Sequence, residues 1–157
     1  MTALQKIDRN DQISAFEFQH PLTYTYTAGI ALERFLKEIR DNERIVGTRC
    51  PNCSLVYVPA ILFCERCFET LDEYLEMPSK GTVTTFTFNY EDLEGNKLET
   101  PAIIAMVQID GAHGGLIHKL CQVDCEDVRI GMPVRAIFKP KKERVGSILD
   151  ITGFEPV

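Results

Sequence analysis

Two pairs of cysteines carry the strongest chemical signal in this sequence. Cys50 and Cys53 enclose two residues, Cys64 and Cys67 enclose two more, and ten residues separate the pairs. Each Cys-x-x-Cys turn brings two sulfur atoms together, so two facing turns can form a tetrahedral site. Zn²⁺ prefers that geometry, with zinc–sulfur distances of about 2.3 Å. The spacing therefore predicts a zinc ribbon with these four ligands, and it leaves iron in the same site as an alternative.

Four cysteine ligands leave no open coordination position on the metal, which indicates a structural site and not a catalytic one. A redox-active dithiol would explain one Cys-x-x-Cys pair, but two pairs at this spacing favour a metal. The segment between the pairs also has too few apolar residues for a core of its own. We therefore expect zinc binding, on the order of 10 kcal/mol, to supply most of the folding free energy of this lobe.

A helix is expected to precede the cysteines. Thr27 is a suitable N-cap residue, and the pattern predicts a helix from there to about Asn42. One apolar face has residues at positions i, i+3, i+4 and i+7, namely Leu32, Phe35, Leu36 and Ile39. Residues 45–49 indicate a short strand that leads into the first cysteine, and residues 78–81 form a break at which the ribbon ends.

From Gly81 onward the apolar residues follow the period of β-strands. We expect strands over residues 83–90, 102–109, 116–123, 134–138 and 147–154. Five short strands with polar turns between them are typical of a small OB-type barrel. The predicted fold class is mostly β, with an N-terminal helical segment. The expected division is an N-terminal arm and helix over 1–44, the zinc ribbon over 45–78 and the OB-fold barrel over 79–157.

The net charge of −6 is unevenly distributed along the chain. Residues 1–49 and residues 101–157 each carry seven basic and seven acidic side chains, whereas residues 50–100 carry three basic and nine acidic ones. Zinc ribbons and OB barrels both occur in nucleic-acid-binding proteins, which need a basic face to displace counterions. The acidic middle of the chain argues against that class, so we expect no nucleic-acid partner.

Length, hydropathy and cysteine content indicate the size class and the compartment of the protein. The 157 residues suffice for one ordinary domain or two small ones. The chain has no run of eighteen apolar residues, and residues 1–18 lack the hydrophobic region of a secretory signal. Six cysteines, four of them in metal-binding spacing, indicate a reducing compartment and not a disulfide framework. We therefore expect a cytoplasmic protein without a membrane partner.

The cysteines outside the ribbon, Cys121 and Cys125, are the candidates for a reactive thiol. His118 lies near Cys121 in sequence, so a Cys–His nucleophile is conceivable. No third group that would orient such a base is visible, and a half-buried structural cysteine is the better interpretation of Cys121. We therefore expect no catalytic residues in this chain.

Two further segments, one strand face and one turn, are each consistent either with ordinary structure or with a contact surface. Phe86, Phe88 and Tyr90 share one face of a predicted strand, which is core if buried and a docking surface if exposed. The glycine-rich turn over 111–115 is an ordinary hairpin turn, or a segment whose backbone approaches a ligand in a partner's active site.

These motifs, in this order, resemble the proteins of the domain-of-unknown-function-35 family, also called acyl-CoA-associated OB-fold proteins. The resemblance implies a rubredoxin-like zinc ribbon followed by an OB-fold, and it covers residues 24 to 150. The matching stretches are Tyr26–Gly29, Phe35-Leu36, Ile45–Cys53, Val58-Pro59, Phe63–Cys67, Gly81–Val83 with Phe86-Thr87, and Ile130–Ala136.

The resemblance also implies a function that composition does not show. Members of the family accompany thiolase-like proteins as the small non-catalytic subunit of a heteromeric enzyme on acyl-CoA substrates. One such enzyme is the benzoylsuccinyl-CoA thiolase of anaerobic toluene degradation, whose small zinc-ribbon subunit is of about this size, and we take it as the first specific candidate. The alternatives are a stand-alone acyl-CoA-binding module or, with less support, a nucleic-acid-binding zinc-ribbon/OB protein.

If the partner binds CoA, the phosphates of CoA would be attracted by the one concentrated basic segment of this chain. Lys139, Lys141, Lys142 and Arg144 lie between the last two predicted strands, in a loop that OB-folds commonly use for ligands. These four side chains are the predicted contacts for CoA phosphates at the interface with the partner. A solvated hairpin tip is the alternative interpretation.

Overall fold

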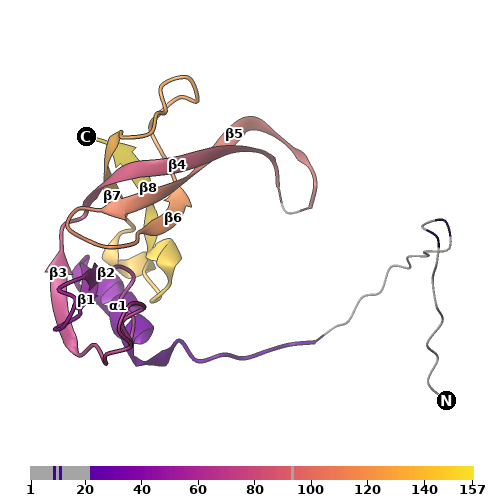
Figure 1. Cartoon of the computed structure of the whole chain (residues 1–157). Coiled ribbons are helices and arrows are strands. Elements are labelled where there is room, and N and C mark those ends of the chain that lie inside the picture. Colours follow the sequence, from indigo (N-terminus) through magenta and orange to yellow (C-terminus); the bar gives the residue numbers. More distant parts are fainter. Residues whose placement is uncertain (1–8, 10, 12–21, 93) are drawn as a thin grey trace, which may run out of the picture.

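The computed structural model describes residues 9, 11, 22–92 and 94–157, and the expectations for residues 1–18 fall mainly outside this part of the chain. After an extended, exposed segment from residue 22 to residue 28, helix α1 spans Gly29–Asn42 (Figure 1). The predicted cap at Thr27 is wrong. The N-cap residue is Ala28, without a side-chain hydrogen bond, and Gly29 begins the helix at φ +76°, a conformation that glycine adopts without strain.

Two residues of the predicted stripe, Phe35 and Ile39, are buried on α1, and Ala31 takes the place of Leu32. Ala31, Phe35 and Ile39 are buried at intervals of four residues and join the main core. Leu36 is half-buried and Leu32 is 37% exposed. The helix therefore buries one edge of its apolar stripe and leaves the other edge open to solvent.

A three-stranded antiparallel sheet follows the helix and carries the cysteines. Its strand order is β2-β1-β3, with β1 over Ile45–Arg49, β2 over Val56–Tyr57 and β3 over Glu73–Met77. The predicted strand over 45–49 is confirmed. The buried hydroxyl of Thr48 donates to the carbonyl of Ile61 and accepts from its N–H, which ties the loop between the two cysteine pairs to the sheet.

A five-stranded antiparallel sheet forms the rest of the protein, in the order β6-β5-β4-β7-β8. Its strands are β4 (Lys80–Glu91), β5 (Lys97–Ile109), β6 (Leu116–Lys119), β7 (Pro133–Phe138) and β8 (Ile151–Pro156). A parallel bridge between Leu120 and Phe154 brings the outer strands together, and the N–H of Cys121 donates to the carbonyl of Phe154 at 2.7 Å. This closure gives the predicted five-stranded OB barrel, so the expected fold class is confirmed.

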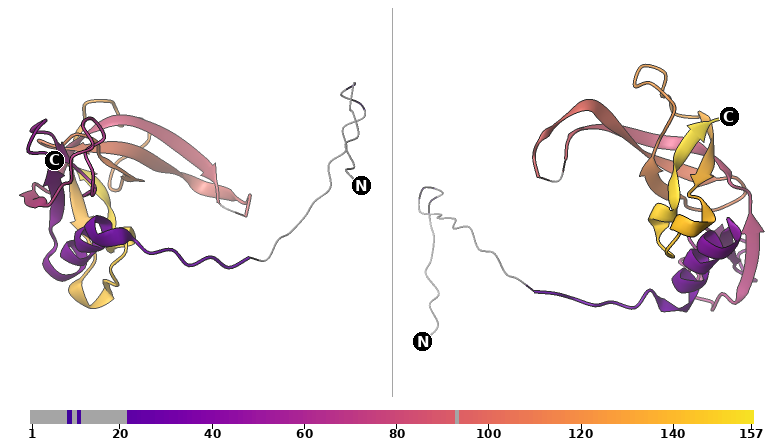
Figure 2. Two further views of the ribbon diagram at one scale, coloured as in Figure 1. Left: turned by 60° about the horizontal axis from the view of Figure 1, so that its bottom comes forward. Right: turned by 180° about the vertical axis from the view of Figure 1, so that it is seen from behind.

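The barrel strands differ from the prediction at their ends. Residues 91–101 were expected to form a loop, but β4 and β5 continue through most of it and make a long hairpin that extends away from the barrel (Figure 2). The third strand ends at Lys119 and not at residue 123. Residues 141–143 and 148–150 form short 3₁₀ turns, η2 and η3, so the last strand begins at Ile151 and not at residue 147.

The aromatic face of β4 is only partly covered, because it follows the hairpin out of the barrel. Phe86 and Phe88 are half-buried and pack against the core, whereas Tyr90 is 61% exposed. No helix among the described residues is long and apolar enough to cross a membrane.

Candidate functional site

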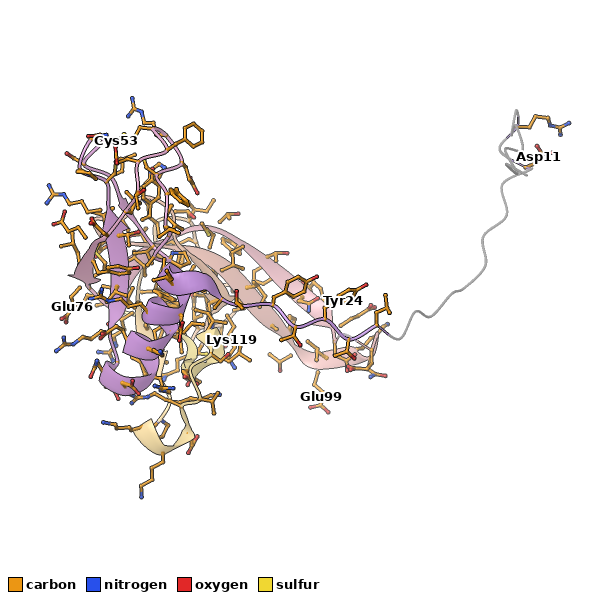
Figure 3. All side chains as sticks on the ribbon, turned by 90° about the horizontal axis from the view of Figure 1, so that it is seen from below. Asp11, Tyr24, Cys53, Glu76, Glu99 and Lys119 are labelled. Carbon is orange, nitrogen blue, oxygen red and sulfur yellow. The ribbon has the colours of Figure 1, made fainter. Side chains whose placement is uncertain are left out.

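The structure brings the four ribbon cysteines together. The sulfur atoms of Cys50, Cys53, Cys64 and Cys67 all lie within 4.8 Å of one another, and those of Cys50 and Cys67 are 3.5 Å apart. Tetrahedral zinc would hold its sulfurs roughly 3.8 Å apart, so the cluster has the size of a zinc site. Cys53 lies near the tip of the two loops (Figure 3). Four sulfur ligands of this spacing fit zinc, whose role there is to cross-link the two loops.

The two cysteine loops have the same backbone geometry. In the first, Cys50 donates its N–H to the carbonyl of Leu55 and accepts from the N–H of Ser54. In the second, Cys64 makes the equivalent bonds, at 2.8 and 2.9 Å, with Glu69 and Phe68. Ser54 and Phe68 both have positive φ, at 57° and 61°. Each loop therefore turns its two sulfurs to one side before the chain returns to the sheet.

A tyrosine supports the buried side of this cluster. The hydroxyl of Tyr57 lies 3.2 Å from the sulfur of Cys64, and both side chains are buried. When Cys64 is the thiolate, the Tyr57 hydroxyl is the donor of this hydrogen bond. This hydrogen bond lowers the pKa of the Cys64 thiol to about 6 and raises that of Tyr57 to about 12. A lowered thiol pKa favours the thiolate, which is the form that binds zinc.

The same tyrosine links the ribbon to the barrel. Its ring packs edge-on against the imidazole of His113, with ring centroids 5.5 Å apart. The N–H of His113 also donates to the carbonyl of Val56 at 2.6 Å. The glycine-rich turn over 111–115 is thus one contact between the metal lobe and the barrel, beside the core that Ile45 and Val58 share with the barrel strands. Its entry into a partner's active site stays a prediction.

The basic segment after β7 does not act as one group. The side chain of Arg144 is only 2% exposed, and its guanidinium donates to the carbonyls of Lys139 and Arg40, at 2.6 and 3.1 Å, and to the carboxylate of Glu43. A cation at the last turn of a helix also interacts favourably with the helix dipole. Arg144 therefore holds the loop against the C-terminus of α1, and its donors already have partners.

The three lysines of this segment are more open. Lys141 and Lys142 are exposed on η2, and Lys139 is half-buried at the end of β7. Buried Asp150 organises the same loop, because its carboxylate accepts N–H bonds from Val145, Gly146 and Ser147. Burial alone would raise the pKa of Asp150, but these bonds outweigh it and the pKa is lowered.

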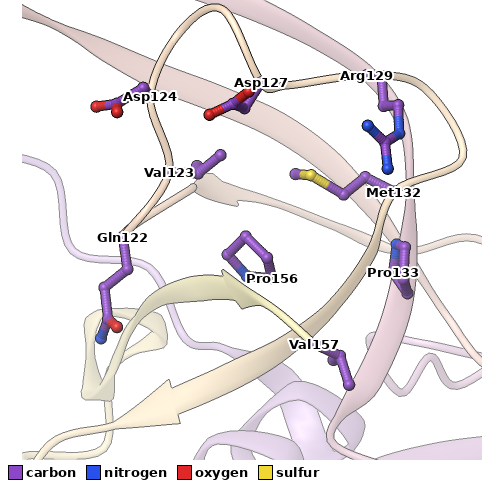
Figure 4. A pocket seen from close by; sticks show the side chains of 9 residues that line it. All are labelled: Gln122, Val123, Asp124, Asp127, Arg129, Met132, Pro133, Pro156 and Val157. Carbon is purple, nitrogen blue, oxygen red and sulfur yellow. The ribbon is translucent and has the colours of Figure 1, made fainter.

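A polar hollow of about 650 Å³ lies beside the loop between β6 and β7 (Figure 4). Asp124 and Asp127 line it together with Arg129. Its two carboxylates do not suit a phosphate ligand, and the basic segment does not contribute to it.

Three apolar hollows share lining residues and form a continuous surface. A hollow of about 330 Å³ beside α1 shares Leu32 and Pro59 with one of about 580 Å³. The second shares Ile117 and Ile148 with a cavity of about 430 Å³ beside β6. We call this surface the apolar strip. Its exposed members are Ile30, Leu32, Leu62, Ile117 and Leu149.

Neither cysteine outside the ribbon is hydrogen-bonded through its thiol among the described residues. The thiol of Cys121 lies over Gly153, where an added Cβ would overlap the sulfur. Cys121 is thus packed at the closure of the barrel, which fits a structural cysteine. Sequence reasoning missed the apolar strip, because its members come from α1, the loop after β2, β6 and η3.

The fold and the cysteine cluster define a zinc-ribbon/OB-fold protein. Residues 37–72 match the model of the ChsH2 rubredoxin-like zinc ribbon domain, and residues 74–139 match that of the ChsH2 C-terminal OB-fold domain. A DUF35 domain-containing scaffold protein of Methanocaldococcus jannaschii is 32% identical over 113 residues, which are 70% of this chain and 78% of that protein. The chain belongs to the DUF35 family.

Two solved structures are similar to this chain. A DUF35 protein of unknown function from Sulfolobus solfataricus is 31% identical, with a TM-score of 0.57, over 67% of this chain and 75% of that chain. The Ltp2-ChsH2(DUF35) aldolase shares the fold at 20% identity, with a TM-score of 0.58, over 83% of this chain and 98% of that one.

Proposed function

We propose that this chain is a non-catalytic, zinc-binding subunit of a heteromeric enzyme that acts on acyl-CoA, and that its catalytic partner is thiolase-like. The apolar strip carries the proposal. It exposes Ile30 (72%) and Ile117 (73%) on different elements, around hollows that a partner's side chains could fill. An exposed apolar surface of this kind is typical of a protein–protein interface.

The comparisons support a subunit role. The archaeal relative is described as a scaffold protein, and a protein of the same fold forms part of an aldolase with Ltp2. Zinc in the ribbon would hold the loop that carries Leu62, so the metal would act on assembly and not on bond making. Our first specific candidate remains the small subunit of benzoylsuccinyl-CoA thiolase.

We assign a second role to the open lysines of the basic segment. Lys139, Lys141 and Lys142 would attract the phosphates of CoA held by the partner, while Arg144 would position their loop. The test is a Lys141→Met/Lys142→Met double variant of the complex. It should raise the KM for acyl-CoA several-fold and leave kcat and complex formation unchanged, and an unchanged KM would contradict this role.

The docking proposal is tested by coexpression of this chain with a thiolase-like protein from the same organism. A stoichiometric complex should form, and Ile30→Asp should disrupt it because a buried, unpaired carboxylate is costly. Ile130→Asp is the matched control, since Ile130 is 68% exposed and lies outside the apolar strip. If Ile30→Asp and the control assemble equally well, the interface lies elsewhere.

A further inference from the structure

The long hairpin leaves one edge of β4 without a strand partner. Among the described residues, β4 pairs with β7 only over residues 80–82. The backbone of Val83 then bonds to Gly131 and Met132, and beyond it no strand of the described chain covers this edge. Residues 84–90 therefore present unpaired backbone N–H and C=O groups where the hairpin extends away from the barrel (Figure 2). A row of such groups is a template for pairing with another strand.

The sequence of this edge lacks the features that prevent such pairing. Residues 81–90 contain no charged side chain and no proline. The other edge of the hairpin, on β5, is paired with β6 only over residues 104–107, and it carries Lys97, Glu99 and Pro101. Charged side chains and proline on an edge strand block its pairing with a further strand. Of the two edges, the one on β4 is therefore the one suited to bind a strand.

The middle of this edge is complementary to itself. The pairing of β4 with β5 is irregular at residues 83–85 and again at 89–91, and Thr87 is the centre of the regular segment between them. In an antiparallel copy centred on Thr87, Phe86 lies opposite Phe88 of the copy. Opposed residues of an antiparallel pair lie on the same face of the sheet, so aromatic side chains meet aromatic ones. Because the segment carries no charge, the two copies do not repel each other.

We propose that this edge binds a second copy of the chain, antiparallel and related by a two-fold axis at Thr87, so that the two barrels share one continuous sheet. Such an interface uses the same surface on both copies. Glu91 of each copy then lies opposite Val83 of the other, beside the turn over 129–132, whose one charged side chain is Arg129. Opposite charges thus meet at both ends of the paired segment.

This dimer is independent of the docking proposal. None of the exposed members of the apolar strip lies on β4 or in the turn over 129–132. The strip therefore stays available to a catalytic partner in each copy, and a failure of either proposal leaves the other standing.

The test compares the mass of the full, zinc-loaded chain with that of its variants by light scattering over a dilution series. The wild type should have twice the mass of one chain. Thr87→Lys should raise the dissociation constant about a hundredfold, because like charges then face each other on the axis. Thr100→Lys is the matched control, since Thr100 is also exposed but lies on β5, and it should dimerise like the wild type. A wild-type chain that is monomeric at every concentration overturns the proposal.

A mixture of Thr87→Lys and Thr87→Glu tests the register itself. Each variant alone should be monomeric, and the mixture should form a one-to-one dimer, because the opposite charges meet when position 87 lies opposite itself. A mixture that associates no more tightly than either variant alone overturns the proposed pairing. If the wild type is monomeric, and Thr87→Lys but not Thr100→Lys weakens a complex with the thiolase-like protein, then that protein and not a second copy occupies the edge.

Discussion

Replacement of Arg144 by methionine should destabilise the fold far more than the same replacement at the neighbouring Lys142. The guanidinium donates to the carbonyls of Lys139 and Arg40 and to the Glu43 carboxylate. A hydrogen bond to a charged group contributes about 1.5–3 kcal/mol. Three such bonds are lost here, but the Glu43 side chain is 56% exposed and water compensates that loss, so we expect about 3 kcal/mol in total.

Thermal unfolding in buffer with excess zinc measures this cost. A loss of about 3 kcal/mol lowers the Tm of a protein of this size by roughly 6–12 °C. Lys142→Met is the matched control, because Lys142 is exposed and should shift the free energy of unfolding by less than about 0.5 kcal/mol. Arg144→Lys should fall between them, since lysine keeps the charge but lacks the forked donors. Equal Tm values for Arg144→Met and Lys142→Met would refute the structural role of Arg144.

Three further predictions test other parts of the structure. The lowered pKa of Asp150 adds to the free energy of unfolding above pH ~4, and this contribution is lost as the pH falls through the folded pKa. Asp150→Asn removes this titrating group, so the stability of the variant should fall less steeply with decreasing pH. Tyr57→Phe should weaken zinc retention against a chelator, because Cys64 loses its hydrogen bond, and unchanged retention would contradict that role. Gly153→Ala should cost about 1–3 kcal/mol of unfolding free energy, because the new Cβ overlaps the Cys121 sulfur. Addition of Cys121→Ala should restore part of that stability, and no recovery would contradict the packing explanation.

The metal centre was predictable because its information is local. The Cys-x-x-Cys spacing determines the turn of each pair, because both sulfurs of a pair then lie on one side of their loop. The four sulfurs come together when the two loops face each other. The barrel was predictable from alternation, as in β6, where Leu116 and His118 are buried and their neighbours exposed. The same alternation places His118 on the inward face of β6.

The structural role of Arg144 was not predictable from the sequence, because it depends on contacts between distant segments. Its basic neighbours suggest a solvated cluster, but its partners Glu43, the C-cap residue of α1, and Arg40 lie 101 and 104 residues away in sequence. Only the tertiary fold brings the end of α1 to this loop and converts one cation into a buried contact. The long hairpin was missed for a related reason, since Glu91 and Lys97 are polar and yet pair across the turn.

We propose that this chain completes a partner enzyme without performing the chemistry. The most direct measurement compares carbon–carbon bond-cleaving or bond-forming activity on acyl-CoA for the thiolase-like partner alone, this chain alone and the reconstituted complex. We predict activity only in the complex, and its loss when zinc is removed from the ribbon before assembly. A purified partner that is equally active without this chain, or activity of this chain alone, would contradict this role.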